Sequence, residues 1–252
     1  MVEFNLDKWN GLFDKFDCSS SRVKGAVKAP HYLKSKSIKP FSLLAVATRS
    51  SGKSTMIRHL YKINNFNKEF DIIIVISNTI STGFYDEFID VNKRILASSY
   101  DEGILISLRE NQDVYKAEHG IFPRALVILD DCIGDKVKYN NELQNLFCMG
   151  RHRGTSVIFI SQTSTLIQSS WRQNSTHVII MRLKGMGLKH VIENFLMDVI
   201  DQEDIGDSKG RIDVYAANLI RFYMNIKYTA VVILYEAQGY GMNDFIKYYD
   251  IN

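Results

Sequence analysis

Residues 47–55, with the sequence Ala-Thr-Arg-Ser-Ser-Gly-Lys-Ser-Thr, most constrain what this chain can fold into. They directly follow the apolar run 41–46 and open the helix-like segment 55–61. A strand, a tight loop and a helix in this order form a cradle for phosphate, because the N–H groups and dipole of the helix N-terminus favour an anion. The segment therefore predicts a nucleotide-binding α/β domain.

The residue types of this loop indicate how it binds ATP and Mg²⁺. Gly52 allows the backbone to approach a β-phosphate closely. We expect Lys53 to reach the β- and γ-phosphate oxygens, Ser54 to ligate the bridging Mg²⁺, and Thr55 to help hold the α-phosphate. The remaining residues of the predicted nucleotide-binding loop are Ala47, Thr48, Arg49, Ser50 and Ser51.

Ala47 stands where the phosphate-loop pattern G-x-x-x-x-G-K-[ST] has its first glycine. This departure raises the question whether the position needs a positive φ, which alanine adopts at some energetic cost. The alternative interpretation is a chance Gly-Lys-Ser in a surface loop. The apolar run before the loop and the motifs after it favour the phosphate cradle.

Composition places the chain among ordinary folded proteins. The 252 residues are 46% apolar and 23% charged, with a net charge of +3, so neither disorder nor a strongly basic tail is indicated. Cys18, Cys132 and Cys148 are too few and too scattered for a disulfide framework or a zinc site, and we expect reduced thiols. The sequence has no signal-peptide pattern and no apolar run of membrane-spanning length, so we expect a soluble protein without a membrane span.

Charge is unevenly distributed near the N-terminus. No Asp or Glu lies between Asp17 and Glu69, whereas eleven Lys and Arg residues fall within that window. Such a field attracts a polyanion such as DNA, although a solvated basic face is an equal alternative. We predict an N-terminal appendage with a basic segment over residues 1–40, and an ATPase domain over 41–252 that includes the C-terminal helices and strand.

Residues 124–132, Arg-Ala-Leu-Val-Ile-Leu-Asp-Asp-Cys, predict a buried strand that ends in two carboxylates. A parallel strand delivers such side chains to the ligand-binding edge of the sheet, as in a Walker B motif. We expect Asp130 to hold Mg²⁺ through water and Asp131 to orient or deprotonate the attacking water. Two acids that merely cap a strand in a turn are the alternative, which the upstream phosphate loop disfavours.

Gln162 ends the next apolar strand, predicted at 155–161 and preceded by Gly-Arg-His-Arg-Gly. Beside the strand of Asp130, its amide would contact both the attacking water and the γ-phosphate, and would report the nucleotide state to the rest of the domain. Alone, a strand-end amide that hydrogen-bonds a loop would be the preferred interpretation. The two earlier motifs favour the catalytic one.

Hydrophobic periodicity predicts the remaining elements. Strands are expected at 41–47, 71–77, 124–131, 155–161, 176–183 and 228–236, and helices at 83–96, 140–149, 188–200 and 212–225. Residues 103–109 fit either a short strand or a helix. An acidic patch within 198–207 fits a neighbour's basic window or a solvated turn, and the tyrosine-rich segment 240–249 fits packing or an interface.

The motifs at 47–55, 126–131, 150–162 and 171–182, in that order, resemble the FtsK/HerA superfamily. More narrowly, they are similar to the genome-packaging ATPases of nucleocytoplasmic large DNA viruses and their virophages. The double aspartate, the pair Arg151-His152, and Arg172 with Asn174 carry this narrower resemblance, which covers roughly residues 41–183. Arg49 within the loop also resembles the large terminase subunits of tailed phages.

The resemblance implies an α/β fold of the RecA-like, additional-strand type, with a mostly parallel central sheet flanked by helices. It implies a homo-oligomeric ring around double-stranded DNA, in which an arginine completes the neighbouring subunit's nucleotide site. Arg151 best matches that position, with Arg153 and Arg172 as the alternatives. The implied function is an ATPase that drives a viral genome into a preformed capsid, at the capsid or portal vertex. The expected location is the viral factory in the host cytoplasm, with virion association as a further option.

Two rival functions remain open at this point. One is another pump of the same superfamily, for chromosome segregation or conjugation, which would normally carry a membrane anchor or a DNA-reading winged helix. The other is a non-catalytic switch whose nucleotide state controls assembly. Turnover of ATP stimulated by double-stranded DNA separates a motor from a switch.

Overall fold

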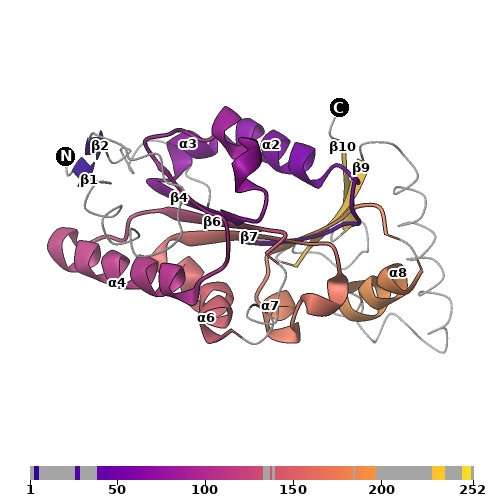
Figure 1. Ribbon diagram of the computed structural model, residues 1–252. Coiled ribbons are helices and arrows are strands. Elements are labelled where there is room, and N and C mark those ends of the chain that lie inside the picture. The colour runs from indigo at the N-terminus through magenta and orange to yellow at the C-terminus, as the bar shows by residue number, and fades with distance from the viewer. Residues whose placement is uncertain are drawn as a thin grey trace. The chain divides into compact units, whose positions relative to one another are not determined.

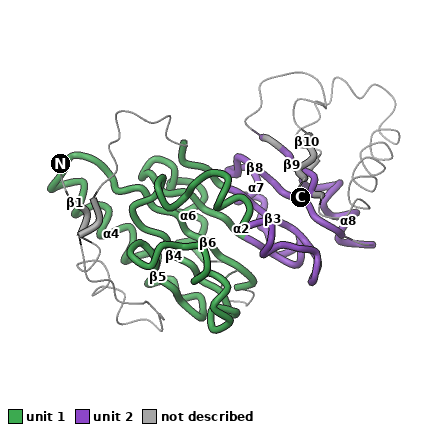
Figure 2. The backbone as a smooth tube through the Cα atoms, turned by 90° about the horizontal axis from the view of Figure 1, so that it is seen from above, with its two compact units in different colours: residues 1–42, 58–159 green, residues 43–57, 160–252 purple. Residues whose placement is uncertain are grey.

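In the computed structural model of this chain, buried aliphatic runs form strands at the predicted positions. The structure describes residues 3–5, 26–28, 39–132, 137, 140–183, 185–196, 229–235 and 246–250. Two compact units are distinguished (Figure 2): unit 1 comprises residues 1–42 and 58–159, and unit 2 comprises residues 43–57 and 160–252.

Unit 1 is built on a parallel set of strands in the order β7-β6-β4-β5. Their bounds are β4 Ile72–Ser77, β5 Arg94–Ala97, β6 Ala125–Asp130 and β7 Thr155–Ser161, of which β7 continues into unit 2. The central strands β4 and β6 are buried along their whole length, which explains their unbroken apolar runs. In the register of this pair, Ser77 lies opposite Asp130.

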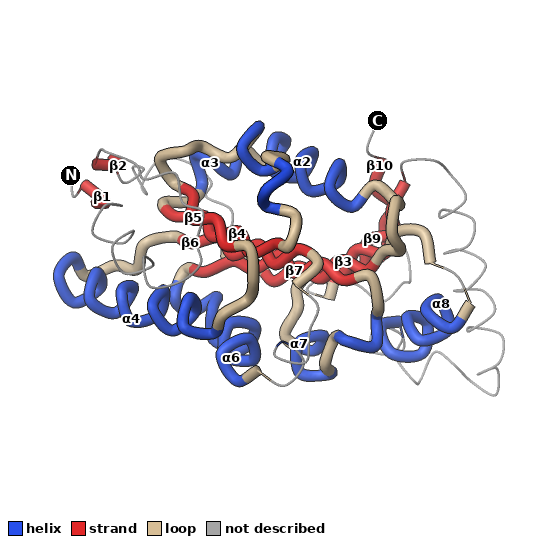
Figure 3. Tube along the Cα trace, viewed as in Figure 1, coloured by secondary structure: helices blue, strands red, loops and turns tan. Residues whose placement is uncertain are grey.

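Helices cover both faces of the unit 1 strands (Figures 1 and 3). Helices α4 (Glu102–His119) and α6 (Asn141–Met149) lie on one face, and α3 (Phe66–Glu69) on the other. Asp101 caps α4 by accepting a hydrogen bond from the Gly103 N–H at 2.8 Å. The connections contain the 3₁₀ turns η1 (Ile80–Thr82), η2 (Tyr85–Glu87) and η3 (Gly150–Arg153).

Unit 2 holds the strand order β10-β9-β8-β3-β7. Its strands are β3 (Ser42–Val46, whose first residue belongs to unit 1), β8 (His177–Ile180), β9 (Thr229–Leu234) and β10 (Ile246–Asp250). The β3–β8 pair is parallel, whereas β9 and β10 join antiparallel. Helices α7 (Ser169–Gln173) and α8 (Met186–Val191) lie on one side of β3, with the turn η4 (Ser164–Leu166) and the π-helical turn η5 (Ile192–Leu196) (Figure 3).

Helix α2 (Lys53–Ile63) starts in unit 2 and continues into unit 1. A separate antiparallel pair, β1 (Glu3–Asn5) and β2 (Ala26–Lys28), belongs to unit 1. Within the described residues, no helix has the length and apolar character needed to cross a membrane.

The predicted fold class is confirmed. The six strands expected between residues 41 and 236 form as β3, β4, β6, β7, β8 and β9, and the sheet is mostly parallel with flanking helices. Strand β7 lies next to β6 in unit 1 and next to β3 in unit 2, as an additional-strand fold requires. Residues 103–109 belong to helix α4, which settles the alternative left open by the sequence.

The predicted helix at 83–96 is wrong. The structure has the 3₁₀ turn η2 followed by a bend and the strand β5. Asp90 stops any helix, because its carboxylate accepts the Asn92 N–H at 2.9 Å and its carbonyl accepts the Lys93 N–H at 3.0 Å. Ile95 then pairs with Ile74 of β4, so tertiary pairing and the Asp90 turn override the helix-like spacing.

Several predictions fall partly or wholly outside the described residues. The helix expected at 188–200 is α8 and η5 as far as residue 196. The acidic patch within 198–207 and the helix at 212–225 lie outside, as does most of the appendage at 1–40. The tyrosine-rich segment 240–249 is described only where β10 covers it.

Candidate functional site

The phosphate-loop candidate lies in unit 2 and ends in a helix N-terminus. Helix α2 begins at Lys53, and the Met56 N–H closes its first turn onto the Gly52 carbonyl at 2.9 Å. Gly52 has φ +93°, a conformation that glycine adopts without strain. Ser50, with φ +60°, is a second left-handed position in the loop. These turns bring the chain from β3 onto the helix within a few residues, as a phosphate cradle requires.

Lys53 folds back over the loop instead of extending into solvent. Its ammonium donates hydrogen bonds to the carbonyls of Ala47 at 3.0 Å and Thr48 at 3.2 Å. A half-buried cation at the N-terminus of a helix favours the binding of an anion at that point. Arg49, Ser54 and Thr55 are exposed beside it, whereas the Ser51 hydroxyl is buried and has no hydrogen-bond partner among the described residues.

The start of the loop is fixed by the ends of two neighbouring strands of unit 2. The Ala47 N–H donates to the Ser161 carbonyl at 3.1 Å, and the Thr48 N–H and hydroxyl both donate to the Arg182 carbonyl, at 3.2 and 2.8 Å. Gln162 follows Ser161 directly, so the structure brings the predicted amide next to the phosphate-loop strand. Arg182 was not among the predicted site residues, and it contributes a main-chain carbonyl.

The structure shows whether position 47, where the pattern has its first glycine, needs a positive φ. Its side chain is fully buried, and the only described non-glycine residues with positive φ are Ser50, Asn65 and Asp131. A left-handed conformation is therefore not needed at position 47, and alanine fits there without backbone strain.

The two predicted acidic residues lie in unit 1, where β6 ends. Asp130 is 6% exposed, and the Tyr85 hydroxyl donates a 2.7 Å hydrogen bond to its Oδ2. Burial, reinforced by the neighbouring Asp130 charge, raises the pKa of the Tyr85 hydroxyl far above its usual range, so it remains a donor. Burial likewise raises the pKa of the Cys132 thiol, which donates to the Ile76 carbonyl at 2.7 Å. Asp130 is thus a buried carboxylate with a fixed neutral donor.

Asp131 adopts an unusual backbone conformation. Its φ is +55°, and its side chain is half-buried where that of Asp130 is buried. The Asn78 side-chain amide donates a 2.9 Å hydrogen bond to the Asp131 carbonyl, which holds this conformation in place. The strand conformation therefore ends at Asp130, the last residue of β6, and is not continued by Asp131. Backbone strain of this kind is concentrated at functional sites.

Sequence reasoning missed Tyr85 and Asn78. Tyr85 lies in the segment wrongly predicted as a helix, 45 residues before Asp130. Asn78 directly follows β4, and the one available signal for it was a polar residue at the end of a parallel strand next to β6.

The three candidate arginines have different surroundings. Arg151 lies in η3 and is half-buried, with its carbonyl accepting the Gly154 N–H at 3.2 Å. Arg153 is tied to α4, with Nη1 2.5 Å from Asp113 Oδ1. In unit 2, Arg172 donates to the Ile167 carbonyl at 3.0 Å and lies over the Phe195 ring at 5.2 Å. The two alternatives therefore have evident structural roles.

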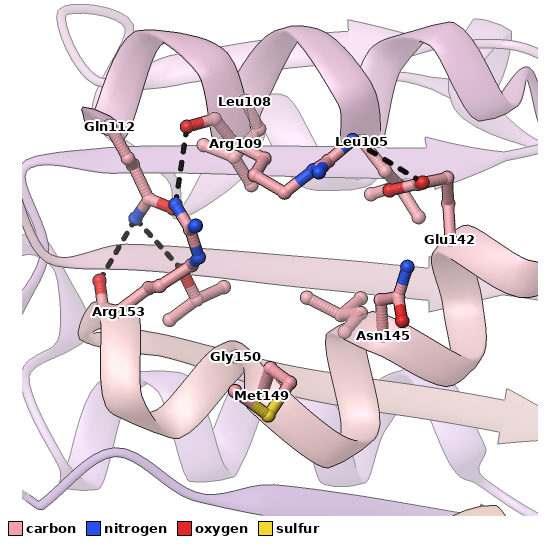
Figure 4. A pocket seen from close by; sticks show the side chains of 11 residues that line it. Leu105, Leu108, Arg109, Gln112, Glu142, Asn145, Met149, Gly150 and Arg153 are labelled. Atoms are coloured by element: carbon pink, nitrogen blue, oxygen red, sulfur yellow. Dashed lines mark hydrogen bonds and ion pairs between the residues drawn. The ribbon is translucent and has the colours of Figure 1, made fainter. Parts of the chain in front are cut away.

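A pocket lies between α4, α6 and η3 in unit 1 (Figure 4). Gln112 spans its floor by donating to the Arg153 carbonyl at 3.1 Å and to the Thr155 hydroxyl at 2.8 Å. At its rim, Arg109 pairs with Glu142 at 3.4 Å. The guanidinium groups of Arg109 and Arg153 are paired with Glu142 and Asp113 of the same unit. These ion pairs connect the helices around the pocket, so it has a structural role and is not the nucleotide site.

Two solved viral packaging enzymes have the same fold as this chain. The genome-packaging NTPase B204 of Sulfolobus turreted icosahedral virus 2, solved with ATP-γS, superposes with a TM-score of 0.59 at 14% identity, covering 85% of this chain and 100% of that one. The DNA-packaging ATPase B204 of Sulfolobus turreted icosahedral virus gives 0.58 at 14% identity, covering 84% and 98%. At this identity the similarity establishes the fold.

Sequence comparison adds one related protein and one family profile. Uncharacterized protein 075L of Invertebrate iridescent virus 6 is 29% identical over 157 residues, which are 61% of this chain and 59% of that protein. This chain therefore matches about three fifths of the length of that relative. The sequence profile of the poxvirus A32 proteins matches residues 31–222. Since that match covers well over half of the chain and includes every predicted site residue, the protein belongs to the poxvirus A32 family.

Proposed function

We propose that this protein is an ATPase motor that translocates double-stranded DNA and packages a viral genome into a preformed capsid. The observation that carries the proposal is the loop before helix α2 in unit 2. Lys53, the first residue of that helix, folds its ammonium back onto the Ala47 and Thr48 carbonyls of the loop. Membership of the poxvirus A32 family and the fold of viral packaging NTPases support the same function.

In the proposed nucleotide site, the phosphates of ATP replace two weak partners of Lys53. The Ala47 and Thr48 carbonyls now accept from the Lys53 ammonium, and the β- and γ-phosphate oxygens are stronger acceptors because they are charged. The main-chain N–H groups of the loop, the buried Ser51 hydroxyl and the exposed Thr55 hydroxyl would donate to the remaining phosphate oxygens.

The acids of unit 1 suit Mg²⁺ and a water nucleophile. Mg²⁺ takes oxygen ligands and is usually bound by one or two carboxylates together with substrate phosphates, a role that Asp130, with the Ser54 hydroxyl, fits chemically. Bound Mg²⁺ would neutralise charge that develops on the phosphates during transfer. Asp131 is the proposed base, since its carboxylate is half-buried where that of Asp130 is buried, and a carboxylate can accept a proton from water.

We also propose that the subunits assemble into a ring, in which an arginine of one subunit completes the nucleotide site of its neighbour. Gln162, held beside the loop by the Ala47–Ser161 hydrogen bond, would orient the water and report the nucleotide state. Arg151 is the proposed trans-acting arginine, because it best matches the position of that arginine in the family that the sequence resembles. DNA passes through the ring, and a capsid or portal vertex is the proposed docking partner. The proposed location is the viral factory in the host cytoplasm, with virion association as a further option.

The basic N-terminal window gives limited support to DNA binding. Of its members, Lys53 is assigned to nucleotide and Arg58 pairs with Glu87 at 2.7 Å, whereas Lys62 and Lys68 are exposed. Positive charge on a surface favours a polyanion by releasing its counterions.

Multiple-turnover release of phosphate, with and without double-stranded DNA, tests this function. A motor releases many phosphates per subunit, faster with DNA than without. A nucleotide-dependent switch binds ATP but shows no DNA-stimulated turnover, and that result would reject the proposal. A pump for segregation or conjugation would share the turnover, and is distinguished by whether loss of the protein leaves empty capsids.

A further inference from the structure

Tyr85 reaches Asp130 from a turn that no sequence motif marks. Both side chains are buried, at 1% and 6% exposed, and the Tyr85 hydroxyl donates to Asp130 Oδ2 at 2.7 Å. A buried hydrogen bond to a carboxylate fixes the orientation of that carboxylate, because few alternative partners are present.

The turn that carries Tyr85 is anchored on both sides. Asp86 pairs with the buried Arg94 guanidinium at 2.5 Å, and the same guanidinium donates to the Ile89 carbonyl at 3.0 Å. Glu87 pairs with Arg58 at 2.7 Å. A turn held by charged pairs at consecutive positions leaves little freedom to the tyrosine between β4 and β5.

Aromatic packing completes the anchoring. The Phe84 ring packs edge-on against Tyr85 at 5.1 Å, and the Arg58 guanidinium lies 4.6 Å above the Phe84 ring. Arg58 belongs to α2, the helix that begins at Lys53. The support of Tyr85 thus includes the helix whose first residue is the proposed phosphate ligand.

We propose that Tyr85 is a positioning residue for Asp130, with its hydroxyl holding the carboxylate in the orientation used for Mg²⁺. The inference rests on the proposed ATPase function. Groups that hydrogen-bond a metal ligand set its orientation, and their loss typically weakens metal binding about 10- to 100-fold. A tyrosine suits this task because its hydroxyl can donate the hydrogen bond that the structure shows at Asp130 Oδ2.

The competing explanation is that Asp130 only satisfies the hydroxyl of a buried tyrosine. In that case, removing the hydroxyl would change stability but not the dependence on metal. Tyr61 provides a matched control, since it is equally buried, packs among aromatic rings and donates its hydroxyl to Asn67, away from Asp130.

Tyr85→Phe keeps the ring and removes the hydroxyl, and Tyr61→Phe does the same at the control position. Binding of Mn²⁺ in the presence of ATP-γS, followed by electron paramagnetic resonance, gives metal affinity without turnover. The Mg²⁺ concentration for half-maximal ATP hydrolysis gives it with turnover. Binding of a fluorescent ATP analogue in EDTA, together with thermal melting, reports the fold and the phosphate loop.

The expected result for Tyr85→Phe is metal affinity weakened about 10- to 100-fold in both assays, with nucleotide binding in EDTA unchanged. Tyr61→Phe should match the wild type in both. If Tyr85→Phe binds Mn²⁺ as the wild type does, or if Tyr61→Phe shows the same loss, the positioning role is rejected. If the wild-type protein itself neither binds nor hydrolyses ATP, the proposed function fails and this inference fails with it.

Discussion

The Asn78 side-chain amide donates a 2.9 Å hydrogen bond to the main-chain carbonyl of Asp131. That bond spans the ends of β4 and β6 and holds Asp131 at φ +55°. The second acid of the pair therefore has a left-handed backbone conformation directly after Asp130, the last residue of β6. A substitution that retains this backbone conformation can therefore test whether Asp131 acts on the attacking water.

Asp131→Asn should bind ATP normally and hydrolyse it about 100- to 10,000-fold more slowly, because the proposed general base is lost. Asparagine tolerates positive φ, so the backbone at 131 is retained. Nucleotide binding by fluorescence and single-turnover phosphate release are the measurements. Asp101→Asn is the control, since asparagine caps α4 as well as aspartate does. Near-normal turnover by Asp131→Asn would remove Asp131 from the role of base.

Lys53→Ala should weaken ATP binding about 10- to 100-fold, the factor expected for a lost hydrogen bond to a charged group. Turnover should disappear with it. Lys62→Ala removes an exposed lysine from the last turn of the same helix and should bind ATP-γS as the wild type does. Calorimetric titration with ATP-γS measures both variants. Unchanged affinity in Lys53→Ala would show that the loop does not bind the phosphates.

Arg151→Ala should lower turnover by roughly 10³- to 10⁵-fold, as loss of an arginine finger does, while ATP binding is kept. Because the finger is proposed to act on the neighbouring subunit, mixing Arg151→Ala with Lys53→Ala subunits should restore activity. Some interfaces then pair an intact loop with an intact arginine. A titration of wild type with either variant reveals rings in which one inactive subunit silences all.

The other two arginines serve as controls for that experiment. Arg153→Ala loses its pair with Asp113 and Arg172→Ala loses its place over Phe195, so both should lower the melting temperature. Each folded variant should keep its ATPase activity. Full activity in Arg151→Ala, with loss in either control, would transfer the trans-acting role to the control arginine.

Arg58→Met should shift the Mg²⁺ dependence of hydrolysis in the same direction as Tyr85→Phe, and by less. The substitution removes the Glu87 pair and the contact over Phe84 while keeping the bulk of the side chain. If Arg58 acts through Tyr85, the double variant should show less than the product of the two single effects. Independent effects that multiply would place Arg58 outside the support of Tyr85.

Whether a feature of this structure is predictable from the sequence depends on how far apart in the chain the interacting residues lie. The strand Ile72–Ser77 was predictable because five successive aliphatic residues suit a strand buried on both faces. The loop between β3 and α2 was predictable because its residues are contiguous. Even its imperfect first position is explained by a local fact, since Ala47 needs no positive φ.

Contacts between distant segments were not predictable. Tyr85 meets Asp130 across 45 residues, and Asn78 meets Asp131 across 53. The segment 83–96 was wrongly predicted as a helix, because its apolar spacing matches one while the Asp90 turn and the pairing of Ile95 with β4 decide otherwise. Periodicity records which residues are buried, and leaves open whether a helix or a turn buries them.

The most direct test of the motor function is displacement of a triplex-forming oligonucleotide from double-stranded DNA. With ATP and Mg²⁺, wild-type rings that move along the duplex should strip the third strand, at a rate that rises with ATP hydrolysis. Asp131→Asn, which should bind ATP without hydrolysing it, should leave the triplex intact. Displacement by the wild type that requires hydrolysis is the predicted result, whereas vigorous DNA-stimulated hydrolysis with no displacement would contradict a translocating motor.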